Sequence, residues 1–307
     1  MNSSTPLLAL RGVSKRFGAV QALDGVDFEV AAGEVVGLVG DNGAGKSTLV
    51  KTISGIYSPD AGEFFFDGQP VSIGGPTDAA VLGIATVYQD LALCDNLDVV
   101  ANLFLGHEEV AAGPAGLTRQ LDEIEMEHRS EELLSNLAVT IPSLRNEVGT
   151  LSGGQRQQVA VARSLLGEPK VVLLDEPTAA LGVAQTAQVL ALIRRLRERG
   201  LGVLVISHNL ADVFEVTDRI FVLRLGRRAA SFATASANQD DVVAAITGAR
   251  ERAATGGNGT GGARCAPHRS RRRRPCPRRS SRRRGSRCSA ASSRAISLPC
   301  ASSWSWR

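Results

Sequence analysis

The fold of this chain is decided by VVGLVGDNGAGKSTLVKTISG, residues 35–55. The apolar run at its start indicates a buried strand, and the stretch from Ser47 onward indicates a helix. GDNGAGKS, residues 40–47, lies between them and matches the pattern G-x-x-x-x-G-K-S. Its glycines let main-chain N–H groups converge on phosphate oxygens, and the helix N-terminus adds partial positive charge. The stretch therefore predicts a strand, a phosphate-binding loop and a helix.

Residues of this loop and of the following helical turn are expected to bind a nucleoside triphosphate. The side chain of Lys46 is expected to reach the β- and γ-phosphates, and the hydroxyl of Ser47 to coordinate Mg²⁺. The other residues of the stretch that we expect to bind nucleotide are Gly40, Asp41, Asn42, Gly43, Ala44, Gly45 and Thr48. ATP and Mg²⁺ are the predicted ligands.

Short apolar runs alternate with amphipathic segments in the second half of the chain. Residues 171–175 and 202–207 indicate buried strands, and residues 183–200 between them have apolar side chains at helical spacing before a glycine. Strand, helix and strand in this order are typical of a parallel sheet.

Other segments indicate two further parts of the fold. Residues 8–18 and 22–34 are typical of antiparallel strands joined by glycine turns, and residues 118–140 are helical in character. We therefore predict an α/β P-loop NTPase with a RecA-like parallel sheet core, an antiparallel β subdomain and a helical subdomain.

VVLLDEP, residues 171–177, is an apolar strand that ends in two carboxylates. Asp175 at the strand end is suited to hold Mg²⁺, directly or through water, and Glu176 to act as the general base toward the attacking water. A strand that ends in a solvated acidic turn is the alternative. The phosphate-binding loop in the same chain favours the catalytic interpretation.

LSGGQ, residues 151–155, begins a second helix whose N-terminus is suited to bind an anion. At this point the sequence resembles the ATP-binding subunits of ABC transporters, for which LSGGQ is the signature. The resemblance implies that Ser152, Gly153, Gly154 and Gln155 cover the γ-phosphate held by a partner subunit. It therefore implies a head-to-tail homodimer with two ATP molecules between the subunits.

Three further residues match the family in chain order. By resemblance, Gln89 contacts the Mg²⁺ or the attacking water and senses the membrane part of the transporter. His208 corresponds to the switch histidine, which contacts the γ-phosphate. Phe17 matches the position where an aromatic ring stacks on adenine, although a core phenylalanine is the alternative there.

One residue departs from the general family pattern. Gly182 stands where most ABC subunits carry the aspartate that couples the two ATP sites. EPTAALGV, which contains it, is similar to a branch of sugar importers for ribose, xylose and fructose. Residues 88–106, 207–216 and 223–228 also look like single-domain members of that branch. The resemblance covers an ABC-type domain at residues 7–249.

The resemblance implies that the whole domain is the ATP-hydrolysing subunit of an importer. This subunit would lie at the cytoplasmic face of the membrane and energise sugar uptake through a partner permease. DNLDVVANLFLG, residues 95–106, would dock the permease, although plain helix core is the alternative for any single residue there. A sugar-binding protein would act indirectly. An exporter subunit, or a soluble ABC ATPase acting on nucleic acid or ribosomes, is the alternative. Residues 107–150 leave no room for the long coiled-coil insertion of such soluble proteins.

Composition separates residues 250–307 from the rest. Residues 251–307 hold fifteen arginines and one acid, so the tail carries a charge of about +14 and residues 1–250 about −10. We expect a disordered Gly/Arg/Ser-rich tail. Its lack of lysine, with much Arg, Ser, Pro, Ala and Cys, favours a frameshift-derived extension over a solvated tail or a basic arm that binds phosphates. No nucleic-acid partner is expected.

Cysteine content and hydropathy bear on the compartment. Cys94 is the one cysteine before residue 250, which fits a reducing environment without internal disulfides. The chain has no run of 18 apolar residues and no secretory signal at its start. Both observations agree with a peripheral protein at the cytoplasmic face of the membrane.

Overall fold

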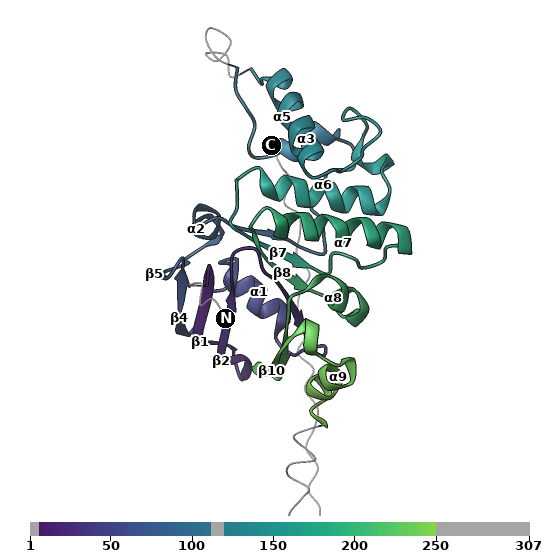
Figure 1. Cartoon of the computed structure of the whole chain (residues 1–307). Helices are drawn as coiled ribbons and strands as arrows, with labels where there is room; N and C mark the ends of the chain where they lie inside the picture. The colour runs from purple at the N-terminus through teal and green to yellow at the C-terminus, as the bar shows by residue number, and fades with distance from the viewer. Residues whose placement is uncertain (1–5, 112–119, 250–307) are drawn as a thin grey trace, which may run out of the picture. The chain divides into compact units, whose positions relative to one another are not determined.

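The computed structural model describes residues 6–111 and 120–249 (Figure 1). The chain divides after Gly259, and every helix and strand below belongs to the part before it. The predicted tail, residues 250–307, lies outside the described residues. So do the first two residues of the helical segment expected at 118–140.

A six-stranded sheet forms the centre of the described part. In spatial order its strands are β10 (Arg227–Ala233), β9 (Arg219–Arg224), β3 (Val35–Val39), β8 (Gly202–Ile206), β7 (Val171–Asp175) and β6 (Ile84–Val87). Neighbouring strands are parallel except for the antiparallel pair of β10 with β9. Strands β7 and β8 are adjacent and are joined by α7 (Val183–Glu198), so the predicted strand–helix–strand unit is confirmed.

A second, antiparallel sheet contains the N-terminal strands. Its order is β2 (Val20–Val30), β1 (Leu8–Phe17), β4 (Ala61–Phe66) and β5 (Gln69–Val71). Leu8 of β1 pairs with Val30 of β2 and with Phe66 of β4. The predicted antiparallel strands are therefore present, and they form one subdomain.

Alternate residues of the central strands face two hydrophobic clusters. Val172 and Leu174 of β7 pack in the cluster that contains α7 and α6 (Gly153–Leu165). Leu173 packs in the other cluster, with the antiparallel sheet and with α1 (Lys46–Ile53). Figure 1 shows α6 and α7 on one side of β7 and β8, and α1 on the other. Strands buried on both faces account for the continuous apolar runs of the sequence.

Five further helices lie in residues 6–111 and 120–249. They are α2 (Pro76–Val81), α3 (Val99–Phe104), α5 (Glu123–Asn136), α8 (Leu210–Val216) and α9 (Gln239–Thr247), with 3₁₀ turns at Val148–Thr150 and Thr234–Ser236. Across residues 6–111 and 120–249, no helix has the length and apolar character needed to cross a membrane.

Helix α5 starts later than the helical segment expected from residue 118. The Asp122 side chain accepts the N–H of Glu125 at 3.1 Å and so caps the helix N-terminus. Just before it, Leu121 forms an antiparallel bridge with Val110. Pairing with a distant segment therefore overrides the helical propensity of residues 120–122.

A substitution at Leu173 tests whether the central sheet is buried on both of its faces. It is 0% exposed, so Leu173→Ala leaves a cavity between β7 and α1 and should lower the free energy of unfolding by about 2–5 kcal/mol. Urea denaturation measures this difference. Val183→Ala is the control, because Val183 is 92% exposed and its truncation should change stability by less than about 0.5 kcal/mol. Equal effects of the two substitutions would contradict the layer arrangement.

Candidate functional site

The phosphate-binding loop connects β3 to α1, as predicted. Gly45 caps α1 with a φ of 104°, a conformation that favours glycine. A Cβ atom at Gly45 would lie 2.6 Å from the carbonyl oxygen of Ala22, and one at Gly40 would collide with the carbonyl oxygen of Leu223. Both glycines are therefore required by close contacts of the loop with neighbouring strands.

The first turn of α1 supplies unpaired main-chain donors. The N–H of Leu49 bonds to the carbonyl of Gly45 at 2.9 Å. The N–H groups of Lys46, Ser47 and Thr48 precede this bond and belong to the helical turn that has no intrahelical acceptor. These N–H groups, together with the helix dipole, are suited to bind phosphate oxygens.

The side chain of Lys46 folds back onto the start of the phosphate-binding loop. Its Nζ atom donates hydrogen bonds to the carbonyl oxygens of Gly40 at 2.7 Å and Asp41 at 3.0 Å. Burial lowers the pKa of Lys46 from its ordinary value, and the negative charges of Glu176, Asp41 and Asp175 oppose this shift. The ammonium group is thus held close to both carboxylates of the 171–177 stretch.

Asp175 ends β7 in a partly buried position. Burial raises the pKa of its carboxyl group, and repulsion from Glu176 raises it further. Lys46 and Lys51 act in the opposite direction. The ionised Asp175 is therefore disfavoured overall, and a nearby cation would stabilise it.

Glu176 occupies an unusual main-chain conformation. Its φ is 53°, while its N–H continues the sheet by donating to the carbonyl of Ile206 at 2.9 Å. Its Oε2 atom lies 2.7 Å from Nδ1 of His208, which follows β8. The Glu176 side chain is 16% exposed and that of His208 is 73% exposed. His208 therefore orients a largely shielded carboxylate while its other ring nitrogen remains available.

A pocket of about 540 Å³ lies beside the phosphate-binding loop and Glu176, and neither Lys46 nor Asp175 is among its described lining residues. Its polar lining comes from the phosphate-binding loop, Glu176, Ser207 and His208. The full lining is Val39, Gly40, Asp41, Asn42, Glu176, Ser207, His208, Leu210, Val243 and Ile246. Sequence reasoning did not assign Ser207 or the apolar residues of α8 and α9 to the site, although residues 207–216 are similar to the sugar-importer branch.

Gln89 lies at the edge of the sheet that is formed by the carboxyl ends of the parallel strands. It is exposed and follows β6 by two residues, while Asp175 ends the neighbouring strand β7 and His208 follows β8 by two residues. The carboxyl ends of adjacent parallel strands share one edge, where α/β folds bind their ligands. The structure therefore brings the phosphate-binding loop, Asp175, Glu176, Gln89 and His208 to a common edge.

Phe17 ends β1 and is 42% exposed, so it is not a buried core residue. Its ring packs edge-to-face against Tyr57, with ring centroids 5.0 Å apart. Sequence reasoning missed Tyr57, which follows α1 by a few residues. The stacking of Phe17 on adenine stays a prediction.

The signature residues form the N-terminus of α6. Ser152 and Gln155 make a reciprocal capping box, because the Ser152 hydroxyl accepts the N–H of Gln155 at 3.3 Å and the Ser152 N–H donates to Oε1 of Gln155 at 3.0 Å. A Cβ at Gly154 would lie 2.9 Å from Cβ of Gln185 on α7. Gly154 is therefore needed for the close packing of two helices, a role that sequence reasoning missed.

The signature is separate from the phosphate-binding loop of the same chain. Of the described residues that line the pocket at that loop, none belongs to the signature. Helix α6 lies on the face of the sheet opposite to α1 (Figure 1). Contacts of Ser152, Gly153, Gly154 and Gln155 with a nucleotide stay predictions.

Gly182 is the N-cap residue of α7. Its φ of −74° and ψ of 164° are accessible to any residue, and a Cβ there would meet open space. Its N–H donates to Oε1 of Gln185 at 3.3 Å. An aspartate would fit this position, so the departure from the family pattern has no steric cause within the chain.

The fold and the phosphate-binding loop define a P-loop ATPase. Residues 23–179 match the ABC transporter family. The chain is 48% identical over 248 residues to the fructose import ATP-binding protein FrcA of Rhizobium meliloti, covering 80% of this chain and 95% of FrcA. It is 50% identical over 223 residues to the xylose/arabinose import ATP-binding protein XylG of Sulfolobus acidocaldarius, covering 72% and 86% of the two chains. The chain belongs to the ABC transporter family, and it is an ATPase of that family.

Solved structures give the same fold. An ATP-binding cassette of an ABC transporter in its ADP conformation superposes with a TM-score of 0.69 at 25% identity, covering 83% of this chain and all of that one. A dimeric cassette in a post-hydrolysis state with ADP and Pi gives a TM-score of 0.61 at 26% identity, covering 74% and 98%. The predicted fold class is confirmed.

Some relatives are about twice as long as the matched region. The ribose import ATP-binding protein RbsA 1 of Rubrobacter xylanophilus is 43% identical over 79% of this chain, and the match covers 47% of the length of RbsA 1.

Asp175→Asn should stabilise the free protein at neutral pH. The raised pKa of Asp175 means that the folded protein binds the proton more tightly than the unfolded chain, so stability falls as pH rises above the ordinary value of 3.8. Asparagine removes this penalty. Urea denaturation in EDTA without nucleotide should show the gain at pH 7 and its decline toward pH 4. A gain that does not depend on pH would contradict the assigned cause.

Gly182→Asp should strengthen the N-terminus of α7. Aspartate is a better N-cap than glycine and interacts favourably with the helix dipole, so we expect a gain of about 0.3–1 kcal/mol in the free energy of unfolding. Thermal and urea denaturation measure it. Gly182→Ala is the matched control, because alanine adds a Cβ without a capping group and should give no gain. Equal stabilities of the two variants would refute the capping argument.

Proposed function

We propose that this chain is the ATP-binding and ATP-hydrolysing subunit of an ABC importer that energises sugar uptake through a partner permease. The observation that carries the hydrolytic part is the contact of Glu176 with His208 beside the phosphate-binding loop. The sugar-import part is supported by 48% and 50% identity to ATP-binding proteins named for fructose and for xylose/arabinose import.

The phosphate-binding loop is proposed to hold the triphosphate. Main-chain N–H groups at the N-terminus of α1 bind phosphate oxygens, and Lys46 exchanges its bonds to the loop carbonyls for bonds to the β- and γ-phosphates. An incoming phosphate supplies the negative charge that a partly desolvated ammonium group requires. Phe17 is proposed to stack on the adenine, with Tyr57 fixing the orientation of its ring.

Glu176 is proposed to act as the general base. It accepts a proton from the water that attacks the γ-phosphorus, while the bond from that phosphorus to the leaving oxygen of ADP breaks. His208 holds the carboxylate through Nδ1 and presents Nε2 toward the pocket for contact with the γ-phosphate. Gln89 is proposed to orient the same water from the end of β6.

The chain offers oxygen donors that fit a magnesium ion. Ser47 presents an exposed hydroxyl, Asp175 a partly buried carboxylate that is repelled by Glu176, and Gln89 an exposed amide oxygen. Hard oxygen ligands suit Mg²⁺, and a divalent cation would offset the carboxylate repulsion. When bound, Mg²⁺ would neutralise charge on the β- and γ-phosphates.

We propose a head-to-tail homodimer as the active unit. Helix α6 packs on the face of the sheet opposite to α1, and no signature residue is among the described residues that line the pocket at the loop, which supports a site completed by a second copy. The N-terminus of α6, with Ser152, Gly153 and Gly154, is suited to cover the γ-phosphate bound by a second copy. ATP binding would then close the dimer, and hydrolysis would open it.

A permease subunit is proposed to dock beside α3 and the loop after Gln89. A groove of about 550 Å³ lies there, and Tyr88, Asp90, Leu105, His107 and Arg163 are among its lining residues. Motion of the dimer would reach the permease through this groove and alternate the access of its sugar pathway. The chain would act at the cytoplasmic face of the membrane, and a sugar-binding protein would deliver the sugar on the other side.

Glu176→Gln tests the assignment of the base. Glutamine keeps the shape of glutamate but cannot accept the proton, so turnover should fall by about 100-fold or more while ATP affinity changes little. Phosphate release and equilibrium ATP binding measure the two quantities. Glu198→Gln is the matched control, because Glu198 is exposed at the end of α7, and it should hydrolyse ATP normally. Near-normal turnover in Glu176→Gln would refute the assignment.

A further inference from the structure

Two segments that are distant in sequence are joined by main-chain hydrogen bonds beside α3. The pre-helix loop, residues 90–98, follows Gln89, and the pre-signature segment, residues 144–149, leads to Ser152. The N–H of Val148 donates to the carbonyl of Leu97 at 2.9 Å, and the N–H of Gly149 donates to that of Asp95 at 2.9 Å. Through these bonds, the position of the signature depends on the conformation of the pre-helix loop.

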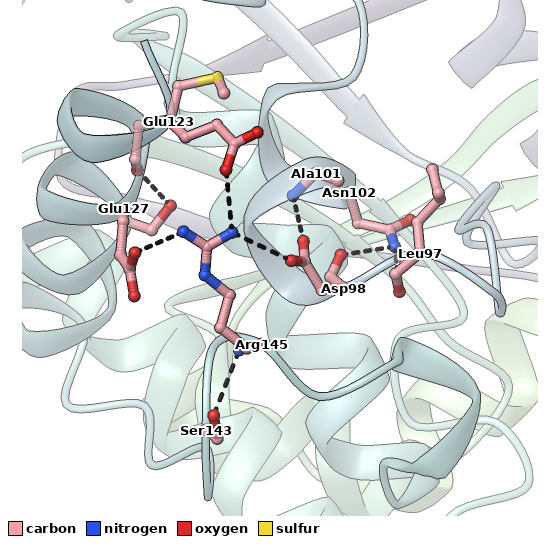
Figure 2. Close-up of polar contacts among 10 residues, drawn as sticks. Leu97, Asp98, Ala101, Asn102, Glu123, Glu127, Ser143 and Arg145 are labelled. Atoms are coloured by element: carbon pink, nitrogen blue, oxygen red, sulfur yellow. Dashed lines mark hydrogen bonds and ion pairs between the residues drawn. The ribbon is translucent and has the colours of Figure 1, made fainter. Parts of the chain in front are cut away.

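Asn102 holds that conformation from inside the protein. It lies on α3 and is 0% exposed. Its Oδ1 accepts the N–H of Cys94 at 2.7 Å, and its Nδ2 donates to the carbonyls of Cys94 at 2.9 Å, Leu97 at 3.1 Å and Asp98 at 3.0 Å. Figure 2 shows this amide beside Leu97 and Asp98. Because an amide nitrogen has two N–H groups, one of them is shared between two of these carbonyls, and both the donors and the acceptor of Asn102 close the loop around one side chain.

Arginines of α6 also reach the pre-helix loop. Nη1 of Arg163 donates to the carbonyl of Ala92 at 2.9 Å. Arg156 is 3.8 Å from Asp95, and its Nε atom is buried without a partner among the described residues. The Arg156 contact is therefore loose, and it holds the loop less firmly than the amide of Asn102 does.

Arg145 forms the outer part of the same network. It lies between Asp98 at 3.5 Å, Glu127 at 2.6 Å and Glu123 at 3.6 Å (Figure 2). The side chains in these ion pairs are between 23% and 67% exposed, so water and salt screen them. Two acids of α5, Glu123 and Glu127, thus orient Arg145. The buried amide is nevertheless the stronger constraint.

We propose that Asn102 is a positioning residue for the signature. It is fully buried, so it acts on the signature through the segments that it holds. It keeps the pre-helix loop and the pre-signature segment as one rigid unit, so that Ser152 and the N-terminus of α6 face the ATP of a second copy. The inference rests on the proposed function, in which the signature completes the partner's site. It gives a role to one residue inside the segment 95–106, and through that residue it connects Gln89 to the signature.

The experiment uses the hydrolysis-deficient Glu176→Gln chain, in which ATP should hold the dimer closed. Adding Asn102→Ala should leave ATP affinity of the monomer within about twofold and weaken ATP-driven dimerisation about tenfold or more. Ultracentrifugation measures dimerisation, and a fluorescent ATP analogue measures monomer binding. Hydrogen exchange should be faster at the amides of Val148 and Gly149, because their acceptors are no longer held in place.

Ser130→Ala is the matched control in the same background. Ser130 is also 0% exposed, and its hydroxyl donates within α5 to the carbonyl of Met126 at 2.7 Å, with no other partner among the described residues. It should change neither dimerisation nor exchange at Val148 and Gly149. Equal weakening by Ser130→Ala and Asn102→Ala would overturn the inference, because it would show a general loss of stability.

Two further outcomes separate the inference from the proposed function. If the Glu176→Gln chain with Asn102 intact does not dimerise with ATP, the proposed function is overturned, and this inference with it. If that chain dimerises and Asn102→Ala dimerises equally well, only the role of Asn102 is overturned. Should Asn102→Ala not fold, Asn102→Ser replaces it. The serine side chain is uncharged and too short to bond all four main-chain groups, and the same outcomes decide.

Discussion

Parallel pairing of β3, β8, β7 and β6 is the constraint on which the site depends. Each of these strands is buried on both faces, so each is held by two hydrophobic clusters as well as by its neighbours. Parallel strands end at the same edge, and the phosphate-binding loop, His208, Glu176 and Gln89 each follow one of these ends. The packing of the core thus assembles groups that are up to about 170 residues apart in sequence.

The charged groups of the site are held in unfavourable surroundings, and the stability of the core compensates for this. Burial raises the pKa of Asp175 and lowers that of Lys46, so both charged forms are disfavoured relative to water, although each partly stabilises the other. Glu176 adds repulsion toward Asp175 and holds a left-handed main-chain conformation. Strain and unfavourable charge of this kind persist where ligands relieve them. A phosphate near Lys46 and a cation near Asp175 would do so.

Local patterns explain which parts were predictable. The loop at 40–47, the carboxylates at 175–176 and the signature at 151–155 are short motifs, and the strands beside them are continuous apolar runs. The sequence predicts a start for α5 that is too early, because the pairing of Leu121 with Val110 leaves no local pattern. Tyr57 and Gln185 contact residues that are distant in sequence, and Asn102 binds a loop whose path the motifs do not specify. The sequence therefore does not reveal their roles.

The sequence by itself determined the chemistry and the family, because the spacing of glycines, lysine and carboxylates is local and specific. Only the tertiary structure decided how these groups meet. The 2.7 Å contact of Glu176 with His208 spans 32 residues and follows from the adjacency of β7 and β8. The closing of the pre-helix loop around Asn102 depends on a buried amide that meets four main-chain groups. Such contacts depend on strand order and burial, which are properties of the whole packed chain.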